Sequence, residues 1–133
     1  MPIAILLAAL AMQSPSPHSI EGRWKSPGGN SIIDIGPCAT GRCGTVAWAS
    51  AKAKEDSRKA TDQLVGTELL TGLEQDAKGR WHGKLFIPDK NMRVTAKLQL
   101  IGDQLRVSGC AAGRALCKST LWSRVDGPLP ISD

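Results

Sequence analysis

The chain has 133 residues, 41% of them hydrophobic and 22% charged, a composition that indicates one globular domain and excludes a largely disordered chain. Its net charge is +5, but the lysines and arginines are dispersed, and the densest basic run, residues 52–59, also holds two acids. With four tryptophans, one phenylalanine and no tyrosine, the chain lacks the aromatic rows that bind single-stranded nucleic acids, so we expect no nucleic-acid partner.

An apolar run over residues 3–12 has the properties of a signal peptide. Such a run is too short to cross a bilayer of about 30 Å as a helix, but it matches the hydrophobic segment of a secretory signal. Ala9 and Ala11 satisfy the small-x-small rule, so we expect a signal peptide over residues 1–11, cleaved after Ala11, and a linker over residues 12–20. No lysine or arginine precedes the run, and an uncleaved anchor is the alternative. We expect a periplasmic or secreted protein that does not span the membrane.

Short strands are predicted in the first half of the remaining chain. Residues 22–25 begin the first, a Pro-Gly-Gly-Asn turn follows at residues 27–30, and residues 31–35 and 45–48 form the next two. Residues 51–63 are charged and poor in apolar side chains, which favours a loop with a possible helical turn.

The second half has the clearest strand, residues 92–100, where apolar and polar side chains alternate strictly. This alternation predicts a strand buried on one face. Gly102 and Asp103 form a turn, and residues 105–109 alternate again, so the two runs form a hairpin. Three further strands complete the set: residues 65–70, 80–87 and 118–125.

About eight short strands with frequent turns predict an all-β, antiparallel fold. Both a sandwich and a closed barrel fit this pattern, and a barrel has the advantage of leaving no free sheet edge. We assign the β-domain to residues 21–126 and a C-terminal tail to residues 127–133.

Four cysteines form two close pairs along the chain. An even number of cysteines after a signal peptide favours disulfides, because exported proteins fold in an oxidising compartment. Three pairings are possible; we favour Cys38–Cys43 and Cys110–Cys117, since each pair brackets a short loop of small residues. A zinc site built from all four is the weaker alternative, because structural zinc pairs usually have about two to four intervening residues. We expect no metal.

Several motifs occur in an order that is specific in combination. They are Gly22-Arg23-Trp24, Ile35-Gly36-Pro37-Cys38 through Cys43-Gly44, Trp81 to Pro88, Lys97-Leu98, Val107 to Cys110, and Cys117 with Trp122-Ser123-Arg124. On these motifs the chain resembles the bacterial domain-of-unknown-function family 2147. The resemblance implies an exported, small antiparallel lipocalin-like β-barrel with no established activity. The family's usual Asn-Pro is missing from residues 57–60, and its usual aromatic is replaced near Val94.

The resemblance also implies structural roles for three residues. Gly22 and Trp24 are similar to the lipocalin signature, in which the tryptophan closes one end of the barrel. In lipocalins an arginine of the last strand lies across that ring, and Arg124 is in the matching position.

No catalytic motif stands out. His18 falls in the linker, and His82 alternates with Trp81 along a strand. Asp34 and Glu68 could face one another as an acid–base pair, although exposure to solvent is the favoured alternative. We therefore expect no enzymatic activity and no cofactor.

The remaining aromatic side chains suggest a ligand site. Trp48, Trp81, Phe86 and Trp122 could line a cavity, with packing in the core or at its rim as the alternative. Because the mouths of barrels are common ligand sites, we expect a small apolar or amphipathic ligand in the cell envelope. The alternative is a structural or protein-interaction module of the envelope with a filled barrel.

Overall fold

A computed structural model describes residues 19–111 and 116–130 of the chain. The predicted signal peptide, residues 1–11, the linker up to residue 18 and the last three residues of the tail lie outside the described residues.

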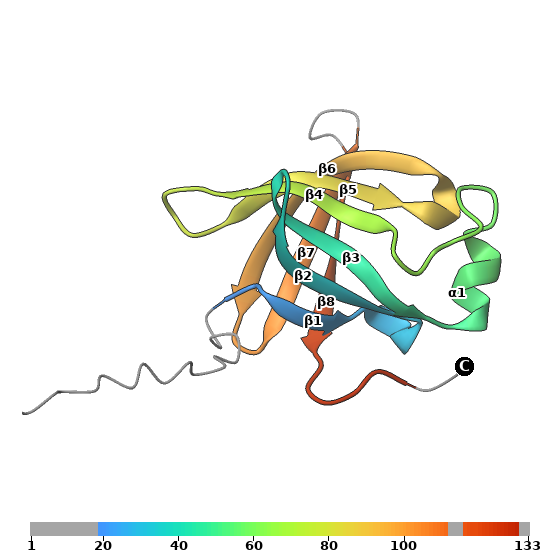
Figure 1. The fold of residues 1–133 in the computed structure, drawn as a ribbon. Helices are drawn as coiled ribbons and strands as arrows, with labels where there is room; N and C mark the ends of the chain where they lie inside the picture. Colours follow the sequence, from blue (N-terminus) through green and yellow to red (C-terminus); the bar gives the residue numbers. More distant parts are fainter. Residues whose placement is uncertain (1–18, 112–115, 131–133) are drawn as a thin grey trace, which may run out of the picture.

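Eight antiparallel strands follow one another around a closed barrel, in which the last strand pairs with the first (Figure 1). The strands are β1 (Gly22–Lys25), β2 (Ser31–Cys38), β3 (Gly41–Ala49), β4 (Glu68–Gln75), β5 (Trp81–Ile87), β6 (Met92–Ile101), β7 (Gln104–Ala111) and β8 (Leu116–Arg124). Three short helical elements join them: the 3-10 turns η1 (Pro27–Gly29) and η2 (Pro88–Lys90), and the α-helix α1 (Ala51–Asp56). The predicted all-β fold is confirmed, and of the two predicted architectures the chain has the barrel. Within the described ranges, no helix is long and apolar enough to cross a membrane.

The alternation in β6 sets the inner face of the barrel. Val94, Ala96 and Leu98 are buried, and Leu98 pairs with Trp81 of β5 and Val107 of β7. Side chains directly opposite one another in a sheet point to the same face, so this row extends across three strands.

β4 begins and ends later than the predicted strand over residues 65–70. Val65 is exposed, and Gly66 lies in a turn with a left-handed φ of 96°. The Gly66 amide donates to the Val46 carbonyl. Beyond Leu70 the strand continues through a bulge at Gly72, whose φ is 60°. Thr71-Gly72 has the composition of a turn, which is why the predicted strand ended at Leu70. The bulge instead lets the strand bend and continue to Gln75.

One end of the barrel, the sealed end, is closed by the segment before β1. Ile20 and Trp24 are buried, and the Trp24 indole Nε1 donates to the Ile20 carbonyl at 2.8 Å. The Arg124 guanidinium lies 4.2 Å from the Trp24 ring and donates to the carbonyls of Ser19 and Glu21 at 2.7 and 3.0 Å. The stacking that the resemblance implies is thus present, and two hydrogen bonds hold the Arg124 guanidinium over the Trp24 ring.

The disulfides join the pairs favoured by the sequence, Cys38–Cys43 and Cys110–Cys117. The first crosses the β2–β3 hairpin, and the second joins directly paired residues of β7 and β8. Each bridge therefore closes a local loop.

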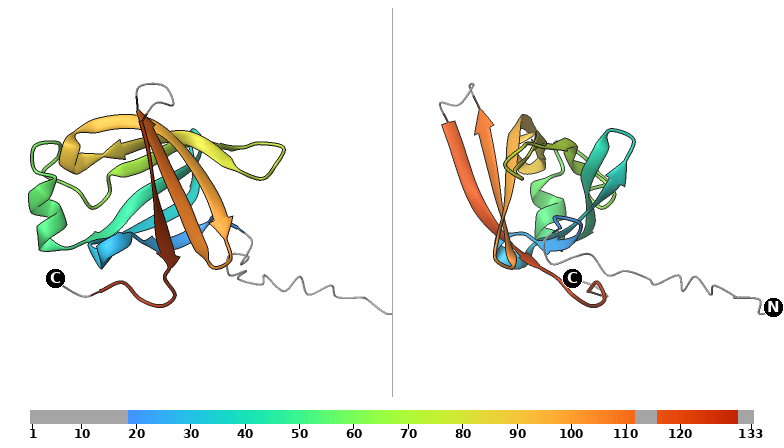
Figure 2. Two further views of the ribbon diagram at one scale, coloured as in Figure 1. Left: turned by 180° about the vertical axis from the view of Figure 1, so that it is seen from behind. Right: turned by 90° about the vertical axis from the view of Figure 1, so that its left-hand side faces the viewer.

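The barrel is closed through a narrow seam, because β1 is short. Only Trp24 and Lys25 pair with β8, opposite Arg124 and Ser123. From Leu116 to Trp122, β8 pairs with β7 alone, and Figure 2 shows the far part of this hairpin standing apart from β2 and β3. The barrel is therefore closed only at the end of β8, and the rest of that strand is an open sheet edge.

Candidate functional site

The end of the barrel opposite the sealed end holds a cavity of about 450 Å³, the mouth cavity. It lies where η1, α1 and η2 gather, at the right of Figure 1. Most of its lining is apolar and comes from the barrel interior and the loop before β4: Ile33, Val46, Leu64, Leu69, Leu85, Phe86 and Trp122.

A hydrogen-bonded link holds the covering elements together. The Ser50 hydroxyl accepts from the Ala53 amide at 3.1 Å, which caps the start of α1, and it donates to the Asn30 side-chain oxygen at 3.1 Å. The Ser50 amide also donates to the Asn30 carbonyl at 2.8 Å. The start of α1 is therefore tied to the segment that follows η1, and the mouth is framed by fixed backbone.

Ser57, which follows α1, is the one buried polar residue among those the structure describes. Its amide donates to the Ala53 carbonyl, and its carbonyl accepts from the amides of Ala60 and Thr61. Ser57 lines the mouth cavity, and its hydroxyl makes no hydrogen bond to any described residue.

Of the four aromatic residues predicted to bind a ligand, the structure brings Phe86 and Trp122 to the mouth cavity. Trp122 is 6% exposed, and its indole Nε1 donates to the Thr120 hydroxyl at 3.2 Å. Phe86 is half-buried at the rim, with the Arg93 guanidinium 4.6 Å from its ring.

Trp48 and Trp81 lie elsewhere. A bulge between Ile32 and Ile33 places Trp48 opposite Ile32 on the outer face, whereas Ile33 and its partner Val46 point inward. Trp81 packs half-buried against the core on the inner face beside Leu98, away from the cavity. The four rings therefore do not form one site.

The barrel runs from Gly22 at the start of β1 to Arg124 at the end of β8, and the family comparison has the same limits. Residues 22–124 match the family described as an uncharacterized protein conserved in bacteria (DUF2147). The chain belongs to this family. No curated protein and no solved structure matches the chain.

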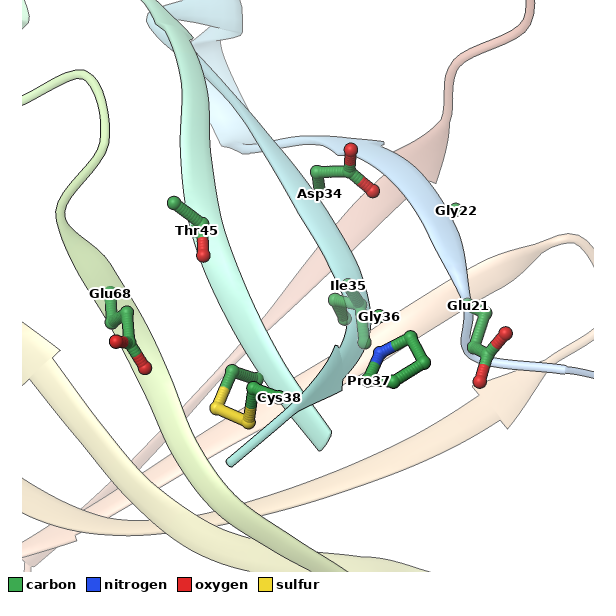
Figure 3. A pocket seen from close by; sticks show the side chains of 10 residues that line it. Glu21, Gly22, Asp34, Ile35, Gly36, Pro37, Cys38, Thr45 and Glu68 are labelled. Carbon is green, nitrogen blue, oxygen red and sulfur yellow. A yellow bond between two sulfur atoms is a disulfide. The ribbon is translucent and has the colours of Figure 1, made fainter. Parts of the chain in front are cut away.

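On the outer face of this DUF2147 barrel, carboxylates border an open pocket of about 510 Å³, the outer hollow (Figure 3). Asp34 and Glu68 flank Thr45 in one cross-strand row, so two strand spacings, about 10 Å, separate their backbones. Both side chains are exposed, and Glu21 is engaged by Arg42 in an ion pair of 2.6 Å. Asp34 and Glu68 thus share a face, but they do not form a close acid–base pair.

The outer hollow also contains the Cys38–Cys43 disulfide. One oxygen of Glu68 and the two sulfur atoms lie within 4.8 Å of one another, as metal ligands would. The sulfur atoms are bonded to each other, however, and metal binding requires thiolates. The residues present do not fit a metal ion in this oxidised form.

His82 belongs to a hydrogen-bonded group at the β4–β5 turn. Asp76 accepts from the backbone amides of Lys78 and Arg80, from the Arg80 guanidinium at 3.2 Å, and lies 2.8 Å from His82 Nε2. The contact with His82, supported by the two amides, holds the pKa of Asp76 well below its usual range. This group stabilises the turn and does not line the mouth cavity.

The residues at the rim of the mouth cavity were not singled out from the sequence. Asp56 and Ser57 lie in the aperiodic stretch after β3, and Asp89 lies in a turn. Strand direction was the available signal: in an antiparallel meander, alternate connections meet at the same end. The connections after β1, β3 and β5 therefore had to meet, and these are η1, the segment containing α1, and η2.

Proposed function

We propose that this protein binds a small apolar or amphipathic molecule in the mouth cavity of its barrel, in the periplasm or outside the cell. The observation that carries the proposal is a cavity of about 450 Å³ with a mostly apolar lining. Ligand pockets usually enclose about 300–1,000 Å³ and combine apolar walls with a few polar groups.

The arrangement of the barrel supports this role. Trp24 and Ile20 fill the sealed end with side chains, whereas the opposite end keeps an open volume under helical elements that are already in place. A preformed cavity needs little ordering when a ligand binds, so more of the contact energy is available for affinity.

The proposed location rests on two features. The apolar run at residues 3–12 fits a secretory signal, and the two disulfides fit an oxidising compartment.

A binding role fits the lining of the cavity better than an enzymatic one. Among the described residues, its polar groups are hydroxyls, one amide and two carboxylates, with no histidine, cysteine or lysine. A hydroxyl nucleophile needs an adjacent base to activate it, and no such pair is bonded in this lining.

The test uses the neutral, apolar fluorescent probe N-phenyl-1-naphthylamine with two variants of the same helix. Ala53 lines the cavity, and Ala51 is exposed outside it. We expect the probe to bind with one site per chain, Ala53→Phe to weaken binding at least tenfold by filling the mouth, and Ala51→Phe to bind as the unmodified chain does.

Two results would overturn the proposal. One is no probe binding, together with no small molecule retained in native mass spectra of protein taken from its own envelope. The other is equal probe affinity in Ala53→Phe, Ala51→Phe and the unmodified chain. Either result would favour the alternative, an envelope module that interacts with proteins.

A further inference from the structure

The charges at the mouth cavity are opposite in sign to those of the whole chain. The chain has 17 lysines and arginines against 12 acids. The cavity lining nevertheless contains two carboxylates, Asp56 and Asp89, and among the described residues no lysine, arginine or histidine. These carboxylates come from α1 and η2, which lie against each other at the mouth. The rim is therefore a local anionic surface on a basic protein.

Two cations near this rim, Lys52 and Arg93, leave its charge available. The Arg93 guanidinium lies 4.6 Å from the Phe86 ring and forms no ion pair with Asp56 or Asp89. Lys52 contacts Asp56 at 2.9 Å, but its side chain is 72% exposed, and an ion pair between exposed groups contributes little. A cation of a bound molecule can replace it at small cost. Asp89 makes no ion pair with any described residue.

Ser57 gives a second, independent indication of a polar ligand group. The residue is 5% exposed and lines the cavity next to Asp56, and its hydroxyl has no hydrogen-bond partner among the described residues. Because no side-chain oxygen of the described residues is both sealed from solvent and unpartnered, this hydroxyl has accessible surface, and Ser57 lines the cavity. A donor group of a ligand can therefore bond this hydroxyl in place of water.

The deeper lining is apolar and aromatic. Leu69 and Leu85 suit an alkyl chain, and the face of Trp122 attracts cations as well as apolar groups. The Phe86 ring already has the Arg93 guanidinium beside it. An anionic head group would have to stand beside Asp56 and Asp89, where like charges repel.

From these features we infer that the ligand is a cationic amphiphile, with an apolar body in the barrel and a protonated amine or quaternary ammonium head at Asp56, Asp89 and Ser57. This inference rests on the proposed function and specifies the chemical class that the same cavity accepts. It assigns Asp56 and Asp89 to charge selection and Ser57 to the hydrogen bond of a protonated amine.

The test compares three probes with the same chain length: decyltrimethylammonium, decanoate and 1-decanol, each below its aggregation concentration and titrated by displacement of the naphthylamine probe. We expect decyltrimethylammonium to bind at least tenfold more tightly than decanoate, with a difference that shrinks as salt is added. The double variant Asp56→Asn/Asp89→Asn is expected to abolish the difference and to leave the affinity for 1-decanol unchanged.

The matched control is Asp103→Asn/Asp126→Asn, which makes the same change in net charge at exposed positions outside the cavity. It is expected to keep the preference for the cation. For Ser57, the comparison is between decylammonium and decyltrimethylammonium, since only the first can donate a hydrogen bond. Ser57→Ala is expected to weaken decylammonium severalfold and to leave decyltrimethylammonium unchanged.

The outcomes separate the two levels of the proposal. If 1-decanol binds and decanoate binds as well as the cation, or if the Asp56→Asn/Asp89→Asn variant keeps the preference, the inferred ligand class is wrong and the proposed function stands. If the naphthylamine probe binds and none of the three probes displaces it, the inferred ligand class is likewise wrong. If the naphthylamine probe itself does not bind and native mass spectra show no retained molecule, the proposed function fails. Equal losses for both cations in Ser57→Ala would contradict the assigned hydrogen bond.

Discussion

At the sealed end, Trp24 is fully buried and covered by Arg124, whereas at the mouth Trp122 borders an open cavity. The sealed end is held by contacts between the two ends of the barrel sequence, since Arg124 bonds to carbonyls more than one hundred residues earlier. The mouth is built from local connections, α1, η1 and η2. The comparison indicates that long-range packing at one end provides stability, which leaves the other end free to keep an unfilled volume.

The largest expected effect comes from truncating the two tryptophans. Trp24→Ala removes a ring packed on all sides, and such truncations cost about 3–5 kcal/mol of unfolding free energy. Trp122→Ala should cost less, toward the lower end of this range, because the ring borders a cavity and packs on fewer sides. Urea unfolding followed by far-ultraviolet circular dichroism measures both losses.

Equal losses for the two variants would contradict the comparison between the two ends. If Trp24→Ala does not fold, Trp24→Phe keeps most of the volume and removes the hydrogen bond to the Ile20 carbonyl. This milder variant should still be less stable than Trp122→Phe.

The two disulfides lie at different ends of the barrel, so removing each one tests whether the ends also differ in how much stability a disulfide contributes. Cys38–Cys43 crosses a hairpin on the side of the sealed end, and by strand direction Cys110–Cys117 belongs to the other. Loop-closure entropy depends on loop length, and the two loops are similar, so replacing either pair by alanines should cost about 2–2.5 kcal/mol. Equilibrium unfolding of the two double variants checks this, and losses that differ by more than twofold would show that folded-state contacts dominate.

The smallest expected effect is at the β4–β5 turn, a connection on the side of the sealed end that does not contact Trp24. The folded state holds the pKa of Asp76 below its unfolded value of about 3.9, so the stabilisation is fully present above that value and is lost as the pH falls further. Asp76→Asn should therefore be less stable than the unmodified chain at pH 7, and the difference should shrink as the pH falls below about 4. Urea unfolding between pH 7 and pH 3 measures this, with Asp103→Asn as an exposed control. A constant difference over that range would rule out the titration of Asp76 as its cause.

Most of the fold was predictable because the signals are local. The strict alternation of residues 92–100 and the turn at Gly102 define the β6–β7 hairpin without tertiary information. The position of Arg124 over Trp24 followed from the resemblance and from no pattern in the chain alone. The face of Trp48 was not predictable, since one bulge at Ile32 and Ile33 reverses which side chains point inward.

The mouth cavity was predictable only in part. Phe86 and Trp122 were identified because aromatic side chains are conspicuous, whereas Asp56 and Ser57 lie in a stretch with no periodicity. Their role depends on which connections meet in space, which becomes apparent only when the direction of every strand is known.

The open edge of β8 bears on how this protein avoids self-association. From Lys118 to Trp122 the second edge of β8 has no strand partner among the described residues, and such an edge recruits a strand from another chain in many proteins. Lys118, paired with Gly109, lies on the face of β8 that continues the barrel interior. A second chain that paired with this edge and extended the sheet would have to bury that ammonium group in an apolar layer. The lysine therefore opposes the pairing of a second strand with this edge.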